Sequence, residues 1–238
     1  MCPETQLYTV AYLIADPSRA AMLALLVDGR ARPAGELAFV AGVTPQTASS
    51  HLAKLLDGGL LLCESEGRHR YYRLAGDHVA QALEHLAAIN RMHPVRKKPL
   101  SQEARTLQFA RRCYDHLAGR LGIAVTRALV EKGYILPAQD KRFEITTLGA
   151  EWFGDLGLDI CALNPGRRGI ARQCLDWTER DHHLAGPIGV QLLTVFCDNG
   201  WLRRSKNSRI IHVTPPGWAA LARHLDVVQE QFHRPVDG

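Results

Sequence analysis

The chain has 238 residues, of which 46% are apolar and 22% are charged, and its formal net charge is +5. This composition excludes extensive disorder, and no apolar run approaches the roughly 20 residues of a membrane-spanning helix. The first ten residues lack the basic and apolar segments of a secretory signal, so we expect a cytoplasmic protein whose six cysteines remain thiols. Because the basic residues are spread along the chain, a nucleic-acid surface would have to be a local patch.

The first 90 residues predict a run of helices followed by a β-hairpin and a closing helix. Asp16-Pro17 and Thr44-Pro45 each place an N-cap residue before a proline at the first helical position, which marks a helix start. Gly42 ends the preceding helix and allows two short helices to cross at a tight corner. The expected helices are 7–14, 17–27, 33–41, 45–56 and 77–90, and the expected strands are 60–64 and 68–74. This order is that of a winged helix-turn-helix.

The helix that follows Thr44 has the composition of a DNA-reading helix. One face is apolar, and the other carries short polar side chains that fit a DNA major groove. An ordinary solvated face is the alternative, but such faces usually carry Glu and Lys pairs, and Thr, Ser and Gln are mediocre helix formers. The candidate DNA contacts here are Thr44, Gln46, Thr47, Ser49, Ser50, His51 and Lys54.

The predicted hairpin turn carries a second set of candidate DNA contacts. Basic side chains at a tight turn can straddle a phosphate backbone or enter the minor groove. Exposed hairpins are also charged for solubility, but the position directly after a polar helix favours DNA contact. The candidates are Arg68, His69, Arg70 and Tyr72.

Residues 91–102 contain two prolines, four basic side chains and no acidic one. We expect a basic linker, which either joins two domains as a solvated segment or contacts DNA phosphates.

An internal repeat occupies the remaining chain. Cys113-Tyr-Asp-His-Leu-Ala-Gly recurs as Cys174-Leu-Asp and, after six further residues, His183-Leu-Ala-Gly. Each copy predicts a helix, two short strands joined by a turn, and a second helix, and in the first copy apolar spacing predicts one helix over about 108–132. The expected domains are 1–90 for DNA binding and dimerisation, the linker 91–102, repeat 103–160 and repeat 161–238. The predicted fold class is therefore mainly α with small β-hairpins, a winged helix-turn-helix followed by tandem winged-helix-like repeats.

The repeat also duplicates residues that ligate metals. Cys113 and His116 have the spacing of one helical face, and the second copy offers Cys174, Asp176 and His183. A thiolate and an imidazole from each copy suit a zinc-like ion, and several thiolates suit a soft metalloid. The alternatives are core positions shared by duplicated units, or oxidation between the two thiols. A metal or metalloid ion is the one cofactor that the sequence suggests.

The segments 14–19, 35–61 and 66–74 resemble the ArsR/SmtB family of bacterial winged-helix repressors. The resemblance covers about residues 6–90. It implies a homodimer, joined by the first and last helices of that unit, that binds a palindromic operator in double-stranded DNA and is released by an effector. The family's cysteine pair in the first helix of the helix-turn-helix has no counterpart in residues 35–42, so sensing is expected in the repeats.

We therefore expect a DNA-binding transcriptional repressor with a possible small effector and no membrane partner. The alternative is a metal- or redox-responsive sensor whose winged helix contacts proteins rather than DNA. An aromatic pocket for an apolar effector is a further alternative, with the candidate lining residues Trp152, Phe153, Trp177 and Trp201. No enzymatic activity is expected, because the sequence has neither a glycine-rich phosphate loop nor a nucleophile elbow.

Overall fold

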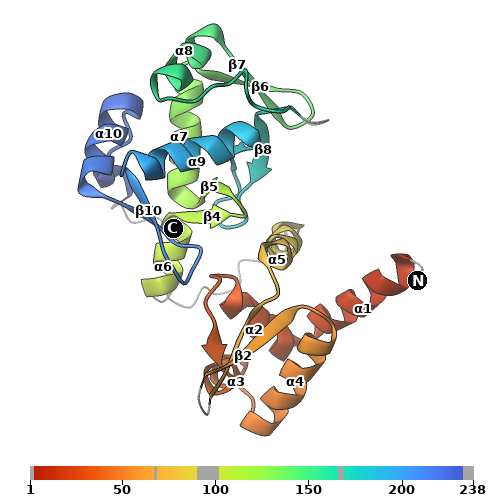
Figure 1. Ribbon diagram of the computed structural model, residues 1–238. Helices are drawn as coiled ribbons and strands as arrows, with labels where there is room; N and C mark the ends of the chain where they lie inside the picture. The colour runs from red at the N-terminus through yellow and green to blue at the C-terminus, as the bar shows by residue number, and fades with distance from the viewer. Residues whose placement is uncertain (1–2, 67–68, 90–101, 166–168, 233–238) are drawn as a thin grey trace. The chain divides into compact units, whose positions relative to one another are not determined.

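The computed structural model divides into two compact units, residues 1–86 and 87–238, called here the N-terminal and the C-terminal unit (Figure 1). It describes residues 3–66, 69–89, 102–165 and 169–232. The predicted linker lies outside the described residues except for Gln102.

The N-terminal unit is a winged helix-turn-helix, as predicted. Its elements are α1 (Pro3–Ala15), α2 (Pro17–Leu26), β1 (Arg32–Pro33), α3 (Ala34–Ala41), α4 (Pro45–Asp57), β2 (Leu61–Glu66), β3 (His69–Leu74) and α5 (Asp77–Ile89). The strands form one antiparallel sheet in the order β1-β3-β2. Strand β1 was not predicted, because two residues are too few to show the alternation of a strand.

The predicted capping residues set the helix starts in this unit. The Asp16 carboxylate accepts a hydrogen bond from the Arg19 backbone N–H at 2.9 Å, and the Thr44 hydroxyl accepts one from the Thr47 N–H at 3.3 Å. Gly42 ends α3 in the left-handed region, with φ 65°. Gly42 and Thr44 therefore set the turn of the chain between α3 and α4.

The core of the N-terminal unit lies between α2, α3 and α4. The fully buried side chains there are Met22, Leu23, Leu26, Leu37, Ala48, Leu52 and Leu55. By length and composition, no single helix in the described part of the chain is long and apolar enough to cross a membrane, although α2 and the part of α1 from Leu7 onward pass that test as a pair bent by 94°.

The C-terminal unit consists of two copies of a hairpin, a helix, a second hairpin and a second helix, after the short helix α6 (Gln102–Phe109). The first copy is β4 (Arg111–Cys113), β5 (His116–Ala118), α7 (Gly119–Glu131), β6 (Ile135–Ala138), β7 (Arg142–Ile145) and α8 (Thr147–Asp155). The second is β8 (Arg172–Leu175), β9 (His182–Ala185), α9 (Pro187–Asp198), β10 (Leu202–Arg204), β11 (Ile211–Val213) and α10 (Pro215–Leu225), followed by a 3-10 turn at Gln229–Phe232.

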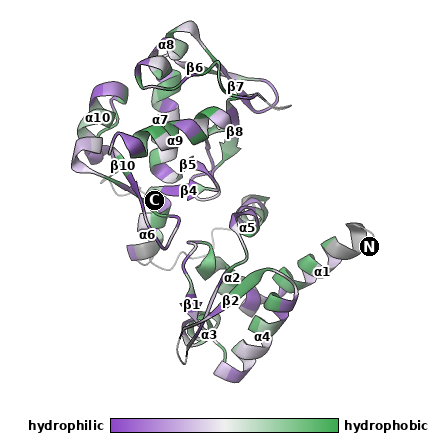
Figure 2. Cartoon of the chain, in the orientation of Figure 1, coloured by the Kyte–Doolittle hydropathy of each residue, from purple (hydrophilic) through white to green (hydrophobic). Residues whose placement is uncertain are grey.

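The two copies share one hydrophobic core. Helix α7 contacts β9 of the second copy, and α9 contacts β5 of the first. Figure 2 shows hydrophobic residues along α9, of which Ile188, Leu193 and Phe196 are fully buried. Pairing between the copies is nearly symmetrical: Arg142 of β7 pairs with Arg172 of β8, which joins the sheet β6-β7-β8-β9, and Arg111 of β4 forms an antiparallel bridge with Ile210, directly before β11.

The predicted continuous helix over 108–132 is wrong. Helix α6 ends at Phe109, the hairpin β4-β5 follows, and α7 begins only at Gly119. Tyr114 turns the hairpin with φ 61°, and Gly119 has φ 79°. A Cβ atom at Gly119 would lie 2.6 Å from the Gln108 carbonyl oxygen, so glycine is required at this close approach. Strands of three residues are too short to show their own alternation.

Candidate functional site

The outer face of α4 is exposed, as the sequence predicted. Gln46, Thr47, Ser49, Ser50 and Lys54 are exposed on this helix. The Ser49 hydroxyl donates to the Pro45 carbonyl at 2.9 Å, and the exposed Thr44 hydroxyl caps the helix. Since the opposite face is buried in the core, this polar face is the one that α4 presents to a partner.

Two predicted DNA contacts are less exposed than the residues of this face. His51 is half-buried, and its Nδ1 lies 3.7 Å from the Asp16 carboxylate at the start of α2. Tyr72 is only 5% exposed, because its strand position faces the core side of the sheet. Both side chains are thus less exposed than the other candidates, and their contact with DNA stays a prediction.

Arg70 is an exposed cation of the wing, the hairpin β2-β3, whereas Arg73 on the same strand is paired with Glu64. Its side chain is exposed, its Nε donates to the Cys63 sulfur at 3.3 Å, and its guanidinium lies 5.7 Å from the Tyr72 ring centroid. A hollow of about 370 Å³ is lined by Ser49 and Ala53 of α4 together with Arg70 and Tyr72. Helix α4 and the wing therefore form one continuous surface. Arg68 and the side chain of His69 lie outside the described residues.

A second candidate site lies in the C-terminal unit, where the two copies bring four metal-ligating side chains together. The ligand atoms of Cys113, His116, Cys174 and His183 all lie within 4.8 Å of one another. The two sulfurs are 3.9 Å apart and the two histidine Nε2 atoms are 3.1 Å apart. Cys113 and the two histidines are at most 5% exposed, and Cys174 is half-buried.

The local geometry of this cluster differs from the prediction. Cys113 and His116 do not share a helical face; they are paired across the two-residue turn of the hairpin β4-β5. Cys174 and His183 are likewise paired across β8 and β9. Each copy therefore contributes one thiol and one imidazole from a hairpin.

Asp176 belongs to the surroundings of the cluster rather than to its ligand atoms, which corrects the prediction. One oxygen accepts a hydrogen bond from Arg111 at 2.9 Å and the other accepts the Gly119 backbone N–H at 2.8 Å. The second oxygen also lies 3.6 Å from Nδ1 of His183. Burial opposes ionisation, but Arg111 and the hydrogen bond from Thr178 outweigh it and hold the pKa of Asp176 well below its usual range.

Burial and hydrogen bonds within the cluster shift the pKa values of its thiol and imidazole groups. The hydrogen bond with Cys174 and burial raise the pKa of Cys113 to about 11. Burial opposes the charged form of His116, but hydrogen bonds with Asp115 and Cys113 outweigh it and raise that pKa to about 9. Burial lowers the pKa of His183. One charged and one neutral imidazole fit the 3.1 Å contact, since one Nε2 must donate and the other accept.

Known proteins resemble the chain in both units. The helix-turn-helix domain family matches residues 14–64. An uncharacterized HTH-type transcriptional regulator of Bacillus subtilis, YdfF, is 45% identical over 218 residues, which is 92% of this chain and 96% of the relative. The HTH-type transcriptional regulator CmtR of Mycobacterium tuberculosis is 38% identical over 86 residues, or 36% of this chain and 72% of the relative. The chain belongs to the ArsR/SmtB-like family of helix-turn-helix transcriptional regulators.

The N-terminal unit of this regulator is thus a helix-turn-helix DNA-binding domain, as the resemblance implied. A solved homodimeric winged helix-turn-helix domain of Mycobacterium bovis, described as a possible ArsR-family regulator, is 30% identical, with a TM-score of 0.36 over 41% of this chain and 90% of that one. Because the YdfF match spans 92% of the regulator, the similarity extends into the C-terminal unit. Both of these relatives, YdfF and CmtR, are HTH-type transcriptional regulators.

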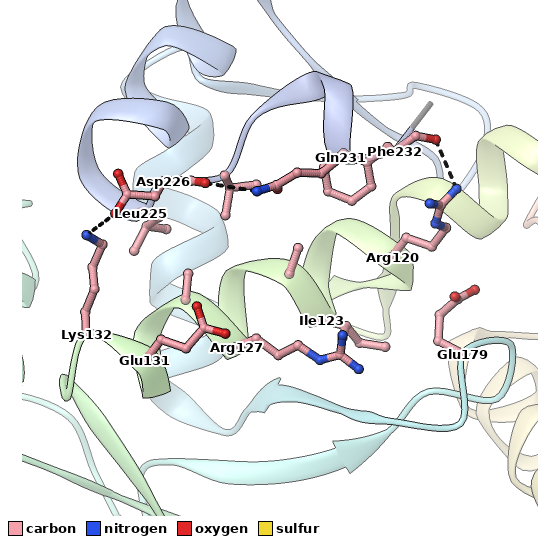
Figure 3. Close-up of a pocket in the computed structure, with 13 residues that line it drawn as sticks. Arg120, Ile123, Arg127, Glu131, Lys132, Glu179, Leu225, Asp226, Gln231 and Phe232 are labelled. Atoms are coloured by element: carbon pink, nitrogen blue, oxygen red, sulfur yellow. Dashed lines mark hydrogen bonds and ion pairs between the residues drawn. The ribbon is translucent and has the colours of Figure 1, made fainter. Parts of the chain in front are cut away.

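A further hollow of about 550 Å³ lies in the C-terminal unit beside α7 (Figure 3). Its cations are already partnered: Arg120 donates to the Phe232 carbonyl, Lys132 pairs with Asp226, and Arg127 pairs with Asp181. Acidic and basic side chains therefore alternate around it, which gives no preference for an anion. The four aromatic residues predicted to line an effector pocket are absent from its walls, which are lined by Arg120, Ile123, Ala124, Arg127, Ala128, Glu131, Lys132, Glu179, Leu225, Asp226, Val227, Gln231 and Phe232.

The sequence analysis missed Arg111, which is 1% exposed, and Asp115 as a partner of His116. Position 111 gave no signal, because a basic pair in an apolar context is typical of an exposed turn. The equivalence of Asp115 to Asp176 in the repeat is a signal that could have identified it.

Proposed function

We propose that the regulator is a homodimeric repressor that recognises a palindromic operator and leaves it when an effector binds. The outer face of α4 carries the DNA-binding part of this proposal. Gln46, Ser50 and Lys54 are exposed there, and side chains of this size can hydrogen-bond base edges in a major groove that admits a helix. Arg70 borders the same hollow and is positioned for a phosphate contact.

The exposed apolar side chains of α1 and α5 support the homodimer. Five large apolar residues are 49–73% exposed on these two helices: Leu7, Tyr8, Tyr12, Leu86 and Ile89. Exposed apolar surface of this kind marks interaction sites, and a second copy buries it symmetrically. A two-fold dimer places two α4 helices in successive major grooves, which is why we propose a palindromic operator.

The effector-responsive element of the proposal is the C-terminal unit. Helix α3 contains no cysteine, so the family's ligand pair in the helix-turn-helix has no counterpart there. An effector can release DNA only if it binds the DNA-free state more tightly than the DNA-bound state.

Base-edge and phosphate contacts predict different effects on DNA binding. Gln46→Ala and Ser50→Ala should each weaken operator binding by about 1–3 kcal/mol while leaving binding to random DNA nearly unchanged. Arg70→Ala should weaken binding to both DNAs and reduce the slope of log K against log salt concentration by about 1. Fluorescence anisotropy at several salt concentrations, on the DNA upstream of the gene and on random DNA, measures both effects.

Arg203→Ala is the matched control, because Arg203 is an exposed arginine on a short hairpin of the C-terminal unit. We expect it to change neither affinity nor salt slope. A wild-type protein that binds both DNAs equally would contradict the proposal and favour a winged helix that contacts proteins.

The proposed dimer predicts a selective effect of charge at α5. Leu86→Glu should lower the fraction of dimer in sedimentation equilibrium, because a carboxylate at an apolar interface loses its hydration. Leu148→Glu is the control: Leu148 is 54% exposed, close to the 49% of Leu86, but lies on α8. Equal effects of the two substitutions, or a monomeric wild-type protein, would contradict the role of α5.

A further inference from the structure

The spacing of the Cys and His cluster matches the edges of a tetrahedral coordination shell. An ion 2.3 Å from each sulfur and 2.0–2.1 Å from each nitrogen places two sulfurs about 3.8 Å apart and two nitrogens about 3.3 Å apart. The corresponding distances here are 3.9 Å between the sulfurs of Cys113 and Cys174 and 3.1 Å between the Nε2 atoms of His116 and His183. The four ligand atoms all lie within 4.8 Å of one another, so a side-chain movement of the order of 1 Å brings them onto one ion.

Each histidine also has the second partner typical of a metal ligand. His116 directs Nε2 into the cluster, and its Nδ1 lies 2.9 Å from the Asp115 carboxylate. His183 has a carboxylate on the same side, but at a greater distance: its buried Nδ1 has no hydrogen bond and lies 3.6 Å from Asp176. The Asp115 carboxylate fixes the His116 tautomer that leaves Nε2 available to an ion, and the nearby Asp176 charge favours the same tautomer of His183. The two carboxylates occupy equivalent positions of the repeat, two residues after each cysteine.

The surroundings leave little room for the cluster to spread. A Cβ atom at Gly122 of α7 would lie 3.7 Å from the His183 Cβ, and one at Gly189 of α9 would lie 3.5 Å from the His116 Cβ. Each histidine therefore packs against a helix of the other copy. Four protein ligands, three of them buried, describe a closed site rather than a catalytic one with an open position.

We propose that Cys113, His116, Cys174 and His183 bind one zinc-type divalent cation that ties the two repeats of the C-terminal unit together. Binding forms two metal–sulfur and two metal–nitrogen bonds, and the thiol protons and the proton between the imidazoles pass to solvent. Two thiolates and two imidazoles suit Zn²⁺, whereas Mg²⁺ and Ca²⁺ require oxygen ligands. The site lies outside the helix-turn-helix, so metal binding can be measured in the absence of DNA.

Cobalt(II) is the probe that tests the proposal on the full, reduced chain after chelator treatment. We expect one Co²⁺ per chain, with the visible bands of tetrahedral cobalt and a thiolate charge-transfer band, and its displacement by one equivalent of Zn²⁺. The double substitution Cys113→Ser with Cys174→Ser should abolish both signals. Cys63→Ser with Cys197→Ser removes two thiols outside the cluster and should leave both signals unchanged.

Asp115→Asn tests the outer carboxylate separately and avoids dependence on a variant that fails to fold. We expect the stoichiometry and band positions to persist, with affinity lowered about 10- to 100-fold in competition with a chromophoric chelator. The proposal is overturned if the wild-type chain binds less than stoichiometric cobalt, gives an octahedral spectrum, or gives the same spectrum without Cys113 and Cys174. Conversion of the two thiols to a disulfide without cobalt binding would also overturn it.

Discussion

Replacement of Asp176 by alanine should lower the free energy of unfolding of the C-terminal unit by about 3–5 kcal/mol, because it leaves a buried arginine without its counter-ion. The Asp176 side chain is fully buried and that of Arg111 is 1% exposed. The carboxylate also accepts the backbone N–H of Gly119, at the first turn of α7, and that of Thr178. Loss of the charge therefore leaves a cation and several donors unsatisfied in the interior.

Differential scanning calorimetry of the full chain with Asp155→Ala as a control measures this effect. Asp155 is exposed at the end of α8, and we expect its removal to change stability by no more than about 0.5 kcal/mol. A loss of less than about 1 kcal/mol in Asp176→Ala would show that water or a neighbouring group compensates Arg111, contrary to the buried pair described here.

A second substitution separates the missing counter-ion from lost packing. Arg111→Met together with Asp176→Leu removes both charges and keeps apolar volume, so it should be more stable than Asp176→Ala alone. The same double variant should still lack the carboxylate behind His183, and its cobalt affinity should fall as in Asp115→Asn. Relative to Asp176→Ala, the double variant should therefore regain stability without regaining cobalt affinity.

Local capping chemistry explains why the N-terminal unit was predictable from its sequence. Asp16 and Thr44 cap helices within three residues of themselves, and Gly42 adopts its left-handed conformation locally. The burial of two side chains in this unit was not predicted, because it depends on packing between elements: His51 lies near Asp16, and Tyr72 is only 5% exposed. Periodicity cannot reveal such contacts, because they depend on where a neighbouring element lies.

The metal cluster was predicted from the right residues in the wrong local structure. Positions i and i+3 lie on one helical face, but they also face each other across a two-residue turn, as Cys113 and His116 do. The repeat preserved the residue types in both copies, which is why four of the five candidates converge. The fifth, Asp176, was grouped with the ligands because sequence cannot tell a carboxylate that binds an ion from one that orients a histidine.

Two glycines of α8 should respond to alanine with opposite signs. A Cβ atom at Gly149 would lie 2.0 Å from the Tyr134 carbonyl oxygen, whereas one at Gly154 would meet no atom within 4 Å. The atom opposite Gly149 is backbone, so the strain can be relieved only by moving α8 away from the hairpin β6-β7. That movement disturbs the stacked rings of Tyr134 and Trp152, whose centroids are 5.0 Å apart. We expect Gly149→Ala to destabilise the C-terminal unit by about 3 kcal/mol.

Gly154→Ala should instead stabilise the unit by about 0.5–1 kcal/mol, because alanine reduces the conformational freedom of the unfolded chain without a clash. In calorimetry the two changes correspond to a fall in Tm of roughly 6–12 °C and a rise of roughly 1–4 °C. Gly217 is the equivalent of Gly149 in the second copy, because a Cβ atom there would lie 1.9 Å from the Trp201 carbonyl oxygen. We therefore expect Gly217→Ala to lower Tm as well. If Gly149→Ala and Gly217→Ala left Tm unchanged, the close approach of each helix to the preceding turn would not be a feature of the folded protein.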